Sequence, residues 1–137
     1  MNNKTILDLM IKDHDKIGRL IHDLKQEKNI QTIKKLFDEF KWEFEKHLFI
    51  EERAIFTFYN PKTEREYTVV PDMLKDHNQL LSFLKKMDSE INNGKINLQE
   101  FEKLLSTHKQ FEEEFFYPKL DEELTNTQKN TIINRLK

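Results

Sequence analysis

The sequence predicts an all-α protein, folded as an antiparallel four-helix bundle with a short C-terminal fifth helix. Only two glycines and three prolines occur among the 137 residues, whereas turn-rich β folds use many more residues that reverse the chain. Four long segments repeat apolar residues at steps of three and four, the period of a helix with one buried face. A chain of this length can bury one core, so we expect a single domain over residues 1–137.

The first two helices are predicted from their boundary residues and apolar stripes. The first begins near Thr5, where Thr5 and Asp8 resemble a capping box, and continues to about Glu27. The second covers about residues 31–58 and is stopped by Pro61, because proline is not tolerated inside a helix. Their inward stripes consist of Ile6, Leu9, Met10, Ile17, Leu20, Ile21 and Leu24, and of Ile33, Leu36, Phe37, Phe40, Phe44, Leu48 and Ile55.

The third helix is predicted after a connecting loop. Residues 59–70 are polar and have no helical period, so we expect a loop there. Pro71 suits the first turn of a helix that continues to about Asn92 and is ended by Gly94. The inward stripe of this helix consists of Met73, Leu74, Leu80, Leu81, Leu84, Met87 and Ile91.

Two further helices complete the predicted bundle. The fourth starts at an Asn97-x-x-Glu100 cap and is ended or kinked by Pro118. Its inward stripe consists of Phe101, Leu104, Leu105, Phe111, Phe115 and Phe116. A short fifth segment follows a Thr125-x-x-Gln128 cap and is long enough to dock on the bundle.

The second helix also carries large aromatic residues every seven positions, away from its inward stripe. They are Trp42, Phe49 and Phe56. Apolar surface of this size needs a cover, and we expect the fifth segment or the long loop to cover it within the chain, rather than another subunit. The expected state is a monomer or a weak dimer.

Composition excludes several classes of function. The 23 basic and 25 acidic residues leave a net charge of -2, so nucleic acid is not expected as a partner. The absence of cysteine excludes disulfides, thiolate nucleophiles and cysteine-held metal sites. No apolar run approaches the roughly 20 residues of a membrane span, and the start lacks a secretion signal. We expect a cytoplasmic protein without membrane contact.

Histidine and glutamate residues on the inward stripes point to a metal site. Four of the five histidines lie one per long helix, and two have a glutamate four residues later, on the same helical face. An ionised carboxylate buried without a partner costs several kcal/mol, and metal ions would offset that cost. Imidazole with carboxylate suits iron or manganese, and zinc also accepts it. The candidate ligands are His14, His47, Glu51, His77, His108 and Glu112.

These motifs, taken in order, resemble the hemerythrin-like or HHE cation-binding family. The matching residues are His14-Asp15, His47-Leu-Phe-Ile-Glu51, Asp76-His77, His108-Lys-Gln-Phe-Glu112 and Phe115-Phe116-Tyr117-Pro118. The resemblance covers nearly the whole chain and implies two iron ions with a bridging oxygen species inside a four-helix bundle. Across the family it also implies functions with oxygen, with nitric oxide or in iron–sulfur repair.

The sequence departs from two family patterns. Oxygen-carrying hemerythrins have a further histidine where this chain has Leu81, so one iron should have a more open coordination sphere. The set of four histidines and two glutamates looks more like the metal domain of iron–sulfur-cluster repair proteins, but their cysteine-bearing segment is missing here. Oxygen carriers place an acid at the position of Glu113, whereas helical spacing favours Glu112.

Several functions follow as hypotheses. The first is a di-iron protein that binds, senses or reacts with a small diatomic ligand or peroxide. The second is a di-iron oxidoreductase acting on peroxide or nitric oxide, and the third is an iron donor or store with an iron–sulfur protein or redox partner. A zinc or manganese bundle without redox activity, and a buried network without metal, are the structural alternatives.

Overall fold

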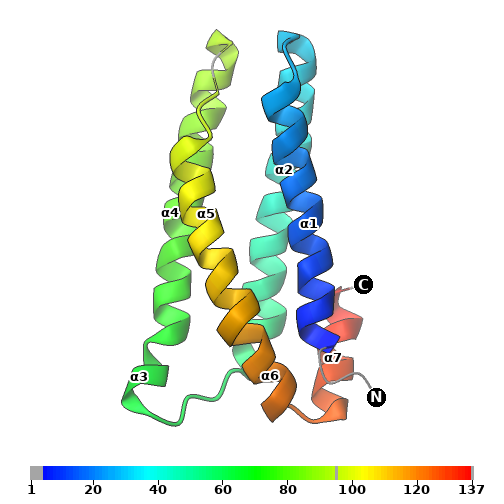
Figure 1. The fold of residues 1–137 in the computed structure, drawn as a ribbon, viewed down its shortest axis with the longest axis vertical. Helices are drawn as coiled ribbons and strands as arrows, with labels where there is room; N and C mark the ends of the chain where they lie inside the picture. The colour runs from blue at the N-terminus through cyan, green and yellow to red at the C-terminus, as the bar shows by residue number, and fades with distance from the viewer. Residues whose placement is uncertain (1–4, 95, 137) are drawn as a thin grey trace.

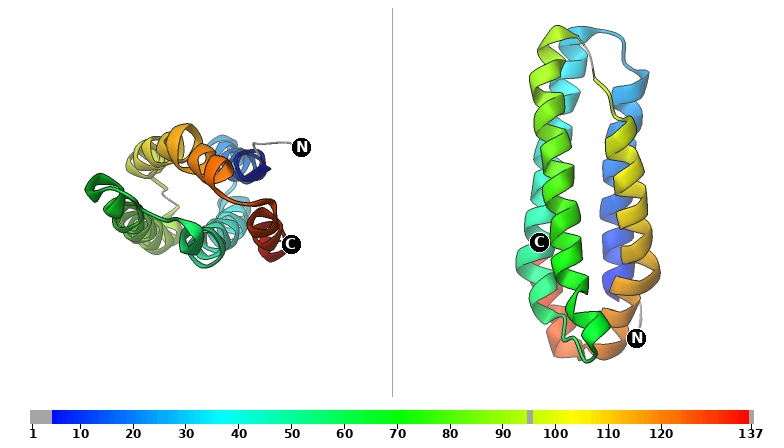
Figure 2. Two further views of the ribbon diagram at one scale, coloured as in Figure 1. Left: turned by 90° about the horizontal axis from the view of Figure 1, so that it is seen from below. Right: turned by 90° about the vertical axis from the view of Figure 1, so that its left-hand side faces the viewer.

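Four long antiparallel helices form the framework of the computed structural model of this protein (Figure 1). The structure describes residues 5–94 and 96–136. The four are α1 (Thr5–Gln26), α2 (Ile30–Ile50), α4 (Val69–Glu90) and α5 (Gln99–Phe111). They follow one another around the bundle in chain order, with α5 beside α1 (Figure 2). The described residues contain no strand, so the predicted all-α class is confirmed.

Short helices lie at one end of the bundle (Figure 1). They are α3 (Glu64–Tyr67), α6 (Tyr117–Glu123) and α7 (Asn126–Leu136). The predicted fifth helix is α7, and it docks on the bundle through Ile132, which is fully buried. Its neighbours are α1 and the helical turn that follows α2.

Several helix ends agree with the sequence signals. The Asn29 side chain caps α2 by accepting hydrogen bonds from the amides of Gln31 and Thr32, at 3.0 and 3.2 Å. The chain leaves α4 through a 3-10 turn, η3 (Ile91–Asn93), and Gly94 follows with φ 76°. Only glycine adopts that left-handed conformation without strain, so the predicted stop at this residue has a backbone cause.

Two predicted boundaries are wrong. The segment expected as a loop, residues 59–70, contains α3, whose first turn is capped by the Thr63 side chain, and α4 already begins at Val69. Pro118 neither ends nor breaks the helical run, which continues into α6. This proline lies in the first turn of α6, directly after a change in the backbone hydrogen-bond pattern, where its missing amide proton is tolerated.

That change is a π-helical turn, and it occurs twice. One such turn, η1 (Glu51–Ile55), directly follows α2, and the other, η4 (Glu112–Phe116), directly follows α5. In each, the amide after the segment bonds to the carbonyl five residues back. The wider turn shifts all later residues by one position relative to an α-helix. The second predicted helix then ends in a 3-10 turn, η2 (Phe56–Phe58).

The expectation that the chain itself covers Trp42, Phe49 and Phe56 is wrong for the first two. Trp42 is 66% exposed and Phe49 is 60% exposed, because they point away from the bundle on the outer face of α2. Phe56 comes after the η1 turn and is buried. Phe111 and Phe115 of the predicted inward stripe are also partly exposed, at 38% and 40%, and stack on each other beside a surface cavity.

The buried apolar residues form two clusters, one at each end of the bundle. The first contains residues of all four long helices, among them Ile17, Leu24, Phe40, Phe44, Leu80, Leu84 and Phe101. The second lies towards the short helices and contains, among others, Ile6, Met10, Ile55, Met73, Phe116, Leu120 and Ile132. Along each long helix, buried polar residues separate the two clusters, so the core has a polar layer near its middle. None of the helices in the described part of the chain has the length and apolar character needed to cross a membrane.

A buried carboxylate ties the start of α1 to α6. Asp121 is 5% exposed, and its two oxygens accept hydrogen bonds from the amides of Ile6 and Leu7, at 2.8 and 3.0 Å. These amides belong to the first turn of α1, where no carbonyl of the helix itself is available. The ammonium of Lys129 on α7 lies 3.5 Å from the same carboxylate. One side chain therefore joins α1, α6 and α7.

We expect Asp121→Ala to lower the free energy of unfolding by about 1–3 kcal/mol, because it leaves two helix-terminal amides and a buried ammonium without their acceptor. Urea unfolding followed by circular dichroism measures the change. Glu122→Ala, at an exposed neighbouring position, is the matched control and should change little. Equal stability of the two variants would contradict the capping role.

Candidate metal centre

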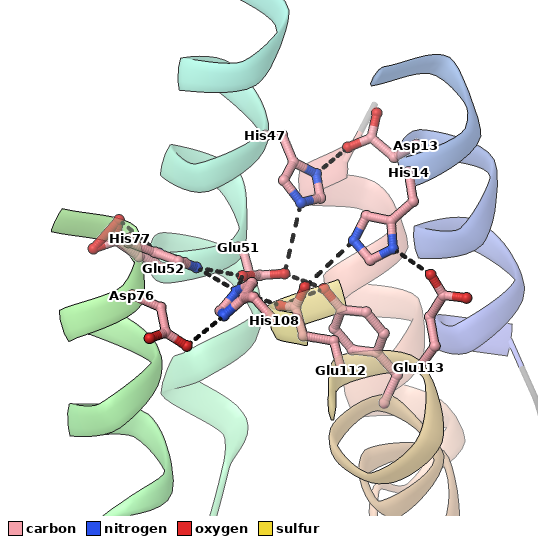
Figure 3. Close-up of polar contacts among 11 residues, drawn as sticks. Asp13, His14, His47, Glu51, Glu52, Asp76, His77, His108, Glu112 and Glu113 are labelled. Atoms are coloured by element: carbon pink, nitrogen blue, oxygen red, sulfur yellow. Dashed lines mark hydrogen bonds and ion pairs between the residues drawn. The ribbon is translucent and has the colours of Figure 1, made fainter. Parts of the chain in front are cut away.

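Six polar side chains from the bundle meet in the layer between the two apolar clusters (Figure 3). They are His14 of α1, His47 of α2, Glu51 of η1, His77 of α4, His108 of α5 and Glu112 of η4. None is more than 6% exposed, and the two glutamates are 0% and 1% exposed. The structure therefore brings together every residue that the sequence predicts as a metal ligand, and His22 lies apart on the surface.

Helical spacing and packing explain why these side chains point into the layer. His47 and Glu51 are four residues apart, as are His108 and Glu112, so each pair shares one helical face. The other two histidines lie on α1 and α4, each between buried apolar residues about one turn away on either side. Packing of those apolar neighbours into the two clusters directs the imidazoles inward.

The donors form two overlapping groups, each with its donor atoms within 4.8 Å of one another. One group consists of His14, His47, Glu51 and Glu112. The other consists of Glu51, His77, His108 and Glu112. Each group offers two imidazole nitrogens and the same two carboxylates, a set that could hold a divalent cation.

The facing imidazoles of His77 and His108 fit a cation held between them. Their Nε2 atoms are 3.1 Å apart, and two nitrogens about 2.1 Å from one ion, at roughly a right angle, would be separated by about 3 Å. The Nε2 atom of His77 is also 2.9 Å from Oε1 of Glu51, yet this buried oxygen has no hydrogen bond to any described residue. A bound cation would satisfy an acceptor that is otherwise costly to bury.

A buried phenol contacts both shared carboxylates. The hydroxyl of Tyr117 donates to Oε2 of Glu51 and lies 2.9 Å from Oε2 of Glu112. Tyr117 is five residues after Glu112, and the π turn between them is what brings the ring over the carboxylate. Because α-helical periodicity places this position off the inward stripe, the sequence analysis missed it.

Each clustered histidine has a further carboxylate at Nδ1, on its outer side (Figure 3). The pairs are His14 with Glu113, His47 with Asp13, His77 with Glu52 and His108 with Asp76. Sequence reasoning missed this role, although each outer carboxylate directly precedes or follows one of the six inner residues. Glu113, weighed as an alternative to Glu112, lies outside both donor groups.

Residues 5–120 match the family described as the hemerythrin HHE cation binding domain. The match includes all six clustered residues and most of the chain. The chain belongs to the hemerythrin HHE cation-binding family. Membership implies metal-ion binding, and the histidine and glutamate layer is the part of this HHE domain that could provide it. No curated protein and no solved structure matches the chain significantly.

The two inner carboxyl groups of the HHE domain titrate as a pair. Burial and the neighbouring charge of Glu51 raise the pKa of Glu112. Burial also acts against ionisation of Glu51, but its polar contacts with Glu112, His108 and His77 outweigh it and hold the pKa of Glu51 well below its usual range. Without metal, the surroundings therefore favour the ionised form of Glu51 and oppose that of Glu112. A cation would favour the ionised form of both.

The pKa values of His47 and His108 are raised, which is the opposite of the effect of burial alone on a histidine. Burial opposes the charged form of His108, but hydrogen bonds to Glu112 and Glu51 outweigh it and raise its pKa to about 11. Burial also opposes the charge on His47, and its hydrogen bond to Asp13 raises the pKa above the usual value. Metal binding must displace protons from such rings, so it is favoured at higher pH.

A small cavity adjoins one side of the cluster. It has a volume of about 20 Å³, which is enough for about one water-sized molecule. Its polar wall consists of His14, His47, His108 and Glu112, with Lys109 at one edge, and its apolar wall of Ile17, Phe44, Leu48 and Leu105. Leu81 is half-buried against the first apolar cluster and is not part of this wall.

The metal-free HHE domain should lose stability as the pH rises. His108 and His47 have raised pKa values in the folded state, so their contribution is fully present below an unfolded pKa of about 6.5 and decreases as the pH rises towards the folded value. One such group changes the free energy of unfolding by about 1 kcal/mol per pH unit. We expect the Tm of chelator-treated protein to fall between pH 6.5 and 9.

Two variants test whether the fall of Tm with pH comes from the clustered histidines rather than from alkaline destabilisation of the whole protein. His108→Gln should flatten the dependence of Tm on pH, whereas His22→Gln, at an exposed position, should leave it unchanged. A Tm that does not vary with pH in the metal-free wild type would contradict the assigned protonation.

Tyr117→Phe should lower the free energy of unfolding of metal-free protein by about 1–3 kcal/mol, because two buried carboxyl groups lose a donor. A bound cation would satisfy the same oxygens, so the loss should be smaller after zinc is added. Tyr59→Phe is the matched control, since the hydroxyl of Tyr59 is buried without a hydrogen bond to any described residue. Urea unfolding with and without zinc measures the stability of both variants. Equal losses of unfolding free energy for Tyr117→Phe and Tyr59→Phe in metal-free protein would refute the role of Tyr117.

Proposed function

We propose that this HHE domain is a non-haem di-iron protein that binds, senses or reacts with a small molecule such as oxygen, nitric oxide or peroxide. The observation that carries the proposal is the pair of donor groups that share two fully buried carboxylates. In this assignment Glu51 and Glu112 are held in common by two ions. The terminal ligands are His14 and His47 for one ion, and His77 and His108 for the other.

The chemistry of the donors supports iron. All six are imidazole nitrogens or carboxylate oxygens, and thiolates are absent from the chain. Such donors suit iron in either common oxidation state, and they also accept manganese or zinc. Each group supplies four protein donors, so both ions would keep positions for a further ligand. Leu81 in place of a further histidine was expected to leave an open coordination position on one iron. In this proposal both ions would have such a position.

The size and lining of the adjoining cavity support a small ligand. A volume of about 20 Å³ is close to that needed for one water-sized molecule, so this cavity favours a ligand of a few atoms over an organic substrate. Phe44, Leu48 and Leu105 form its apolar side and limit the access of water. Iron in this layer would supply an electron-rich centre for such a ligand, while the hydroxyl of Tyr117 holds the shared carboxylates in place.

We expect protein loaded anaerobically with ferrous iron to bind two equivalents and to develop a visible or near-ultraviolet charge-transfer band with oxygen or nitric oxide. Glu51→Ala and Glu112→Ala should bind less iron and lose the band, because each removes a ligand shared by both ions. Metal analysis and absorption spectroscopy measure the two effects. Glu51→Gln tests the same point while preserving side-chain volume.

Glu114→Ala is the matched control, because Glu114 lies in the same π turn as Glu112 but is exposed. It should retain both iron equivalents and the absorption band. Circular dichroism shows whether each variant remains helical. Iron binding by Glu51→Gln and Glu112→Ala equal to that of Glu114→Ala would refute the proposed centre.

A further inference from the structure

We infer that the four outer carboxylates form a closed relay around the bundle, in which each long helix positions the metal-binding histidine of the next, and that the relay is weakest at His77. The inference rests on the proposed function, because it takes the inner histidine nitrogens as metal ligands. It assigns a positioning role to four residues for which the resemblance to the family implies no such role. They are Asp13, Glu52, Asp76 and Glu113.

The first two links join neighbouring helices through residues that precede a histidine. Asp13, directly before His14 on α1, contacts Nδ1 of His47 on α2. Asp76, directly before His77 on α4, has its Oδ2 atom 3.0 Å from Nδ1 of His108 on α5. In both links the carboxylate lies next to a ligand of its own helix and contacts a ligand of the following helix.

The other two links use residues that follow a shared glutamate. Glu113, directly after Glu112, has its Oε2 atom 2.7 Å from Nδ1 of His14 and so joins the end of α5 to α1. Glu52, directly after Glu51, has its Oε2 atom 3.4 Å from Nδ1 of His77 on α4. The direction is the same in all four cases, from α1 to α2, α2 to α4, α4 to α5 and α5 back to α1.

The relay determines which ring nitrogen faces the centre. An ionised carboxylate can only accept a hydrogen bond, so Nδ1 of His14, His47 and His108 must donate its proton. In a neutral imidazole the lone pair is then at Nε2, which points into the donor groups. The outer carboxylates are between 24% and 39% exposed, so they also reach solvent. They also offset positive charge that two cations would bring into the layer.

The four links are not equally strong. Nδ1 of His77 has no hydrogen bond to any described residue, although Oε2 of Glu52 lies 3.4 Å from it, and the ring is stacked on Phe56 at 5.4 Å between centroids. Stacking holds the plane of a ring but does not choose between its two tautomers. His77 is therefore the least constrained donor, and we infer that the ion shared by His77 and His108 leaves and exchanges faster than the ion shared by His14 and His47.

Zinc-loaded protein of residues 1–137 provides the test, because zinc is diamagnetic and accepts the same donors. Long-range proton–nitrogen NMR spectra should show slowly exchanging Nδ1 protons on His14, His47 and His108, and a faster exchanging one on His77. Titration with a chelator should remove one zinc equivalent before the other, and His77 and His108 should be the rings whose signals change first. Simultaneous loss of both equivalents, or early change at His14 and His47, would overturn the assigned weak link.

Substitutions test the positioning role itself. Asp13→Ala, Asp76→Ala and Glu113→Ala should each lower zinc affinity by about 10- to 100-fold, and Glu52→Ala by less. Asp76→Asn should retain the Nδ1 proton signal of His108, because the amide oxygen still accepts the hydrogen bond. Its zinc affinity should lie between those of Asp76→Ala and the wild type. A purely structural effect would not restore that signal.

Asp15→Ala is the matched control, because Asp15 follows His14 directly but is exposed and has no contact with a clustered ring among the described residues. Affinities of the three strong-link variants equal to that of Asp15→Ala would overturn the relay. Failure of wild-type protein to bind two zinc equivalents would instead refute the metal centre. The Nδ1 proton signals of metal-free protein would still report the outer contacts, so the two failures can be told apart.

Discussion

The centre of this protein depends on the cost of burying two carboxyl groups side by side in an apolar interior. Glu51 and Glu112 are 0% and 1% exposed, and each ionised group would cost several kcal/mol without compensation. The surrounding imidazoles and the hydroxyl of Tyr117 provide compensation in the metal-free state. Cations would provide it more completely. Without a ligand the layer therefore lowers the stability of the fold. A bound cation would remove that cost, which links stability to metal binding.

The polar layer is held in position by what lies on either side of it. Each long helix contributes buried apolar residues to one cluster before the layer and to the other cluster after it, so the helices cannot shift without disturbing both. The outer carboxylates add contacts between neighbouring helices at the same level. Ligands on rigid, packed helices keep their positions more precisely than ligands on loops. The architecture thus explains why donors far apart in sequence remain within one small volume.

Two departures from the sequence-based expectations, at Phe56 and Tyr117, have a common cause in the π turns. Uniform α-helical spacing correctly places Glu51 and Glu112 but fails beyond them. After each π turn the next residues are displaced, so Tyr117 comes to lie over Glu112 and Phe56 becomes buried. Only hydrogen bonding in the folded helix shows such a turn, because a single added residue leaves no composition signal.

The sequence by itself determined the class, the helical segments, the apolar stripes and the six clustered residues, because helical periodicity and i, i+4 spacing are local properties of the chain. It also contained the motifs of the HHE family, to which residues 5–120 belong. Only the tertiary structure decided which outer carboxylate meets which histidine, that Asp121 caps α1 from the other end of the chain, and that a cavity adjoins the cluster. These contacts join residues 25 to 115 positions apart, and their partners depend on how the helices pack rather than on the spacing within any one of them.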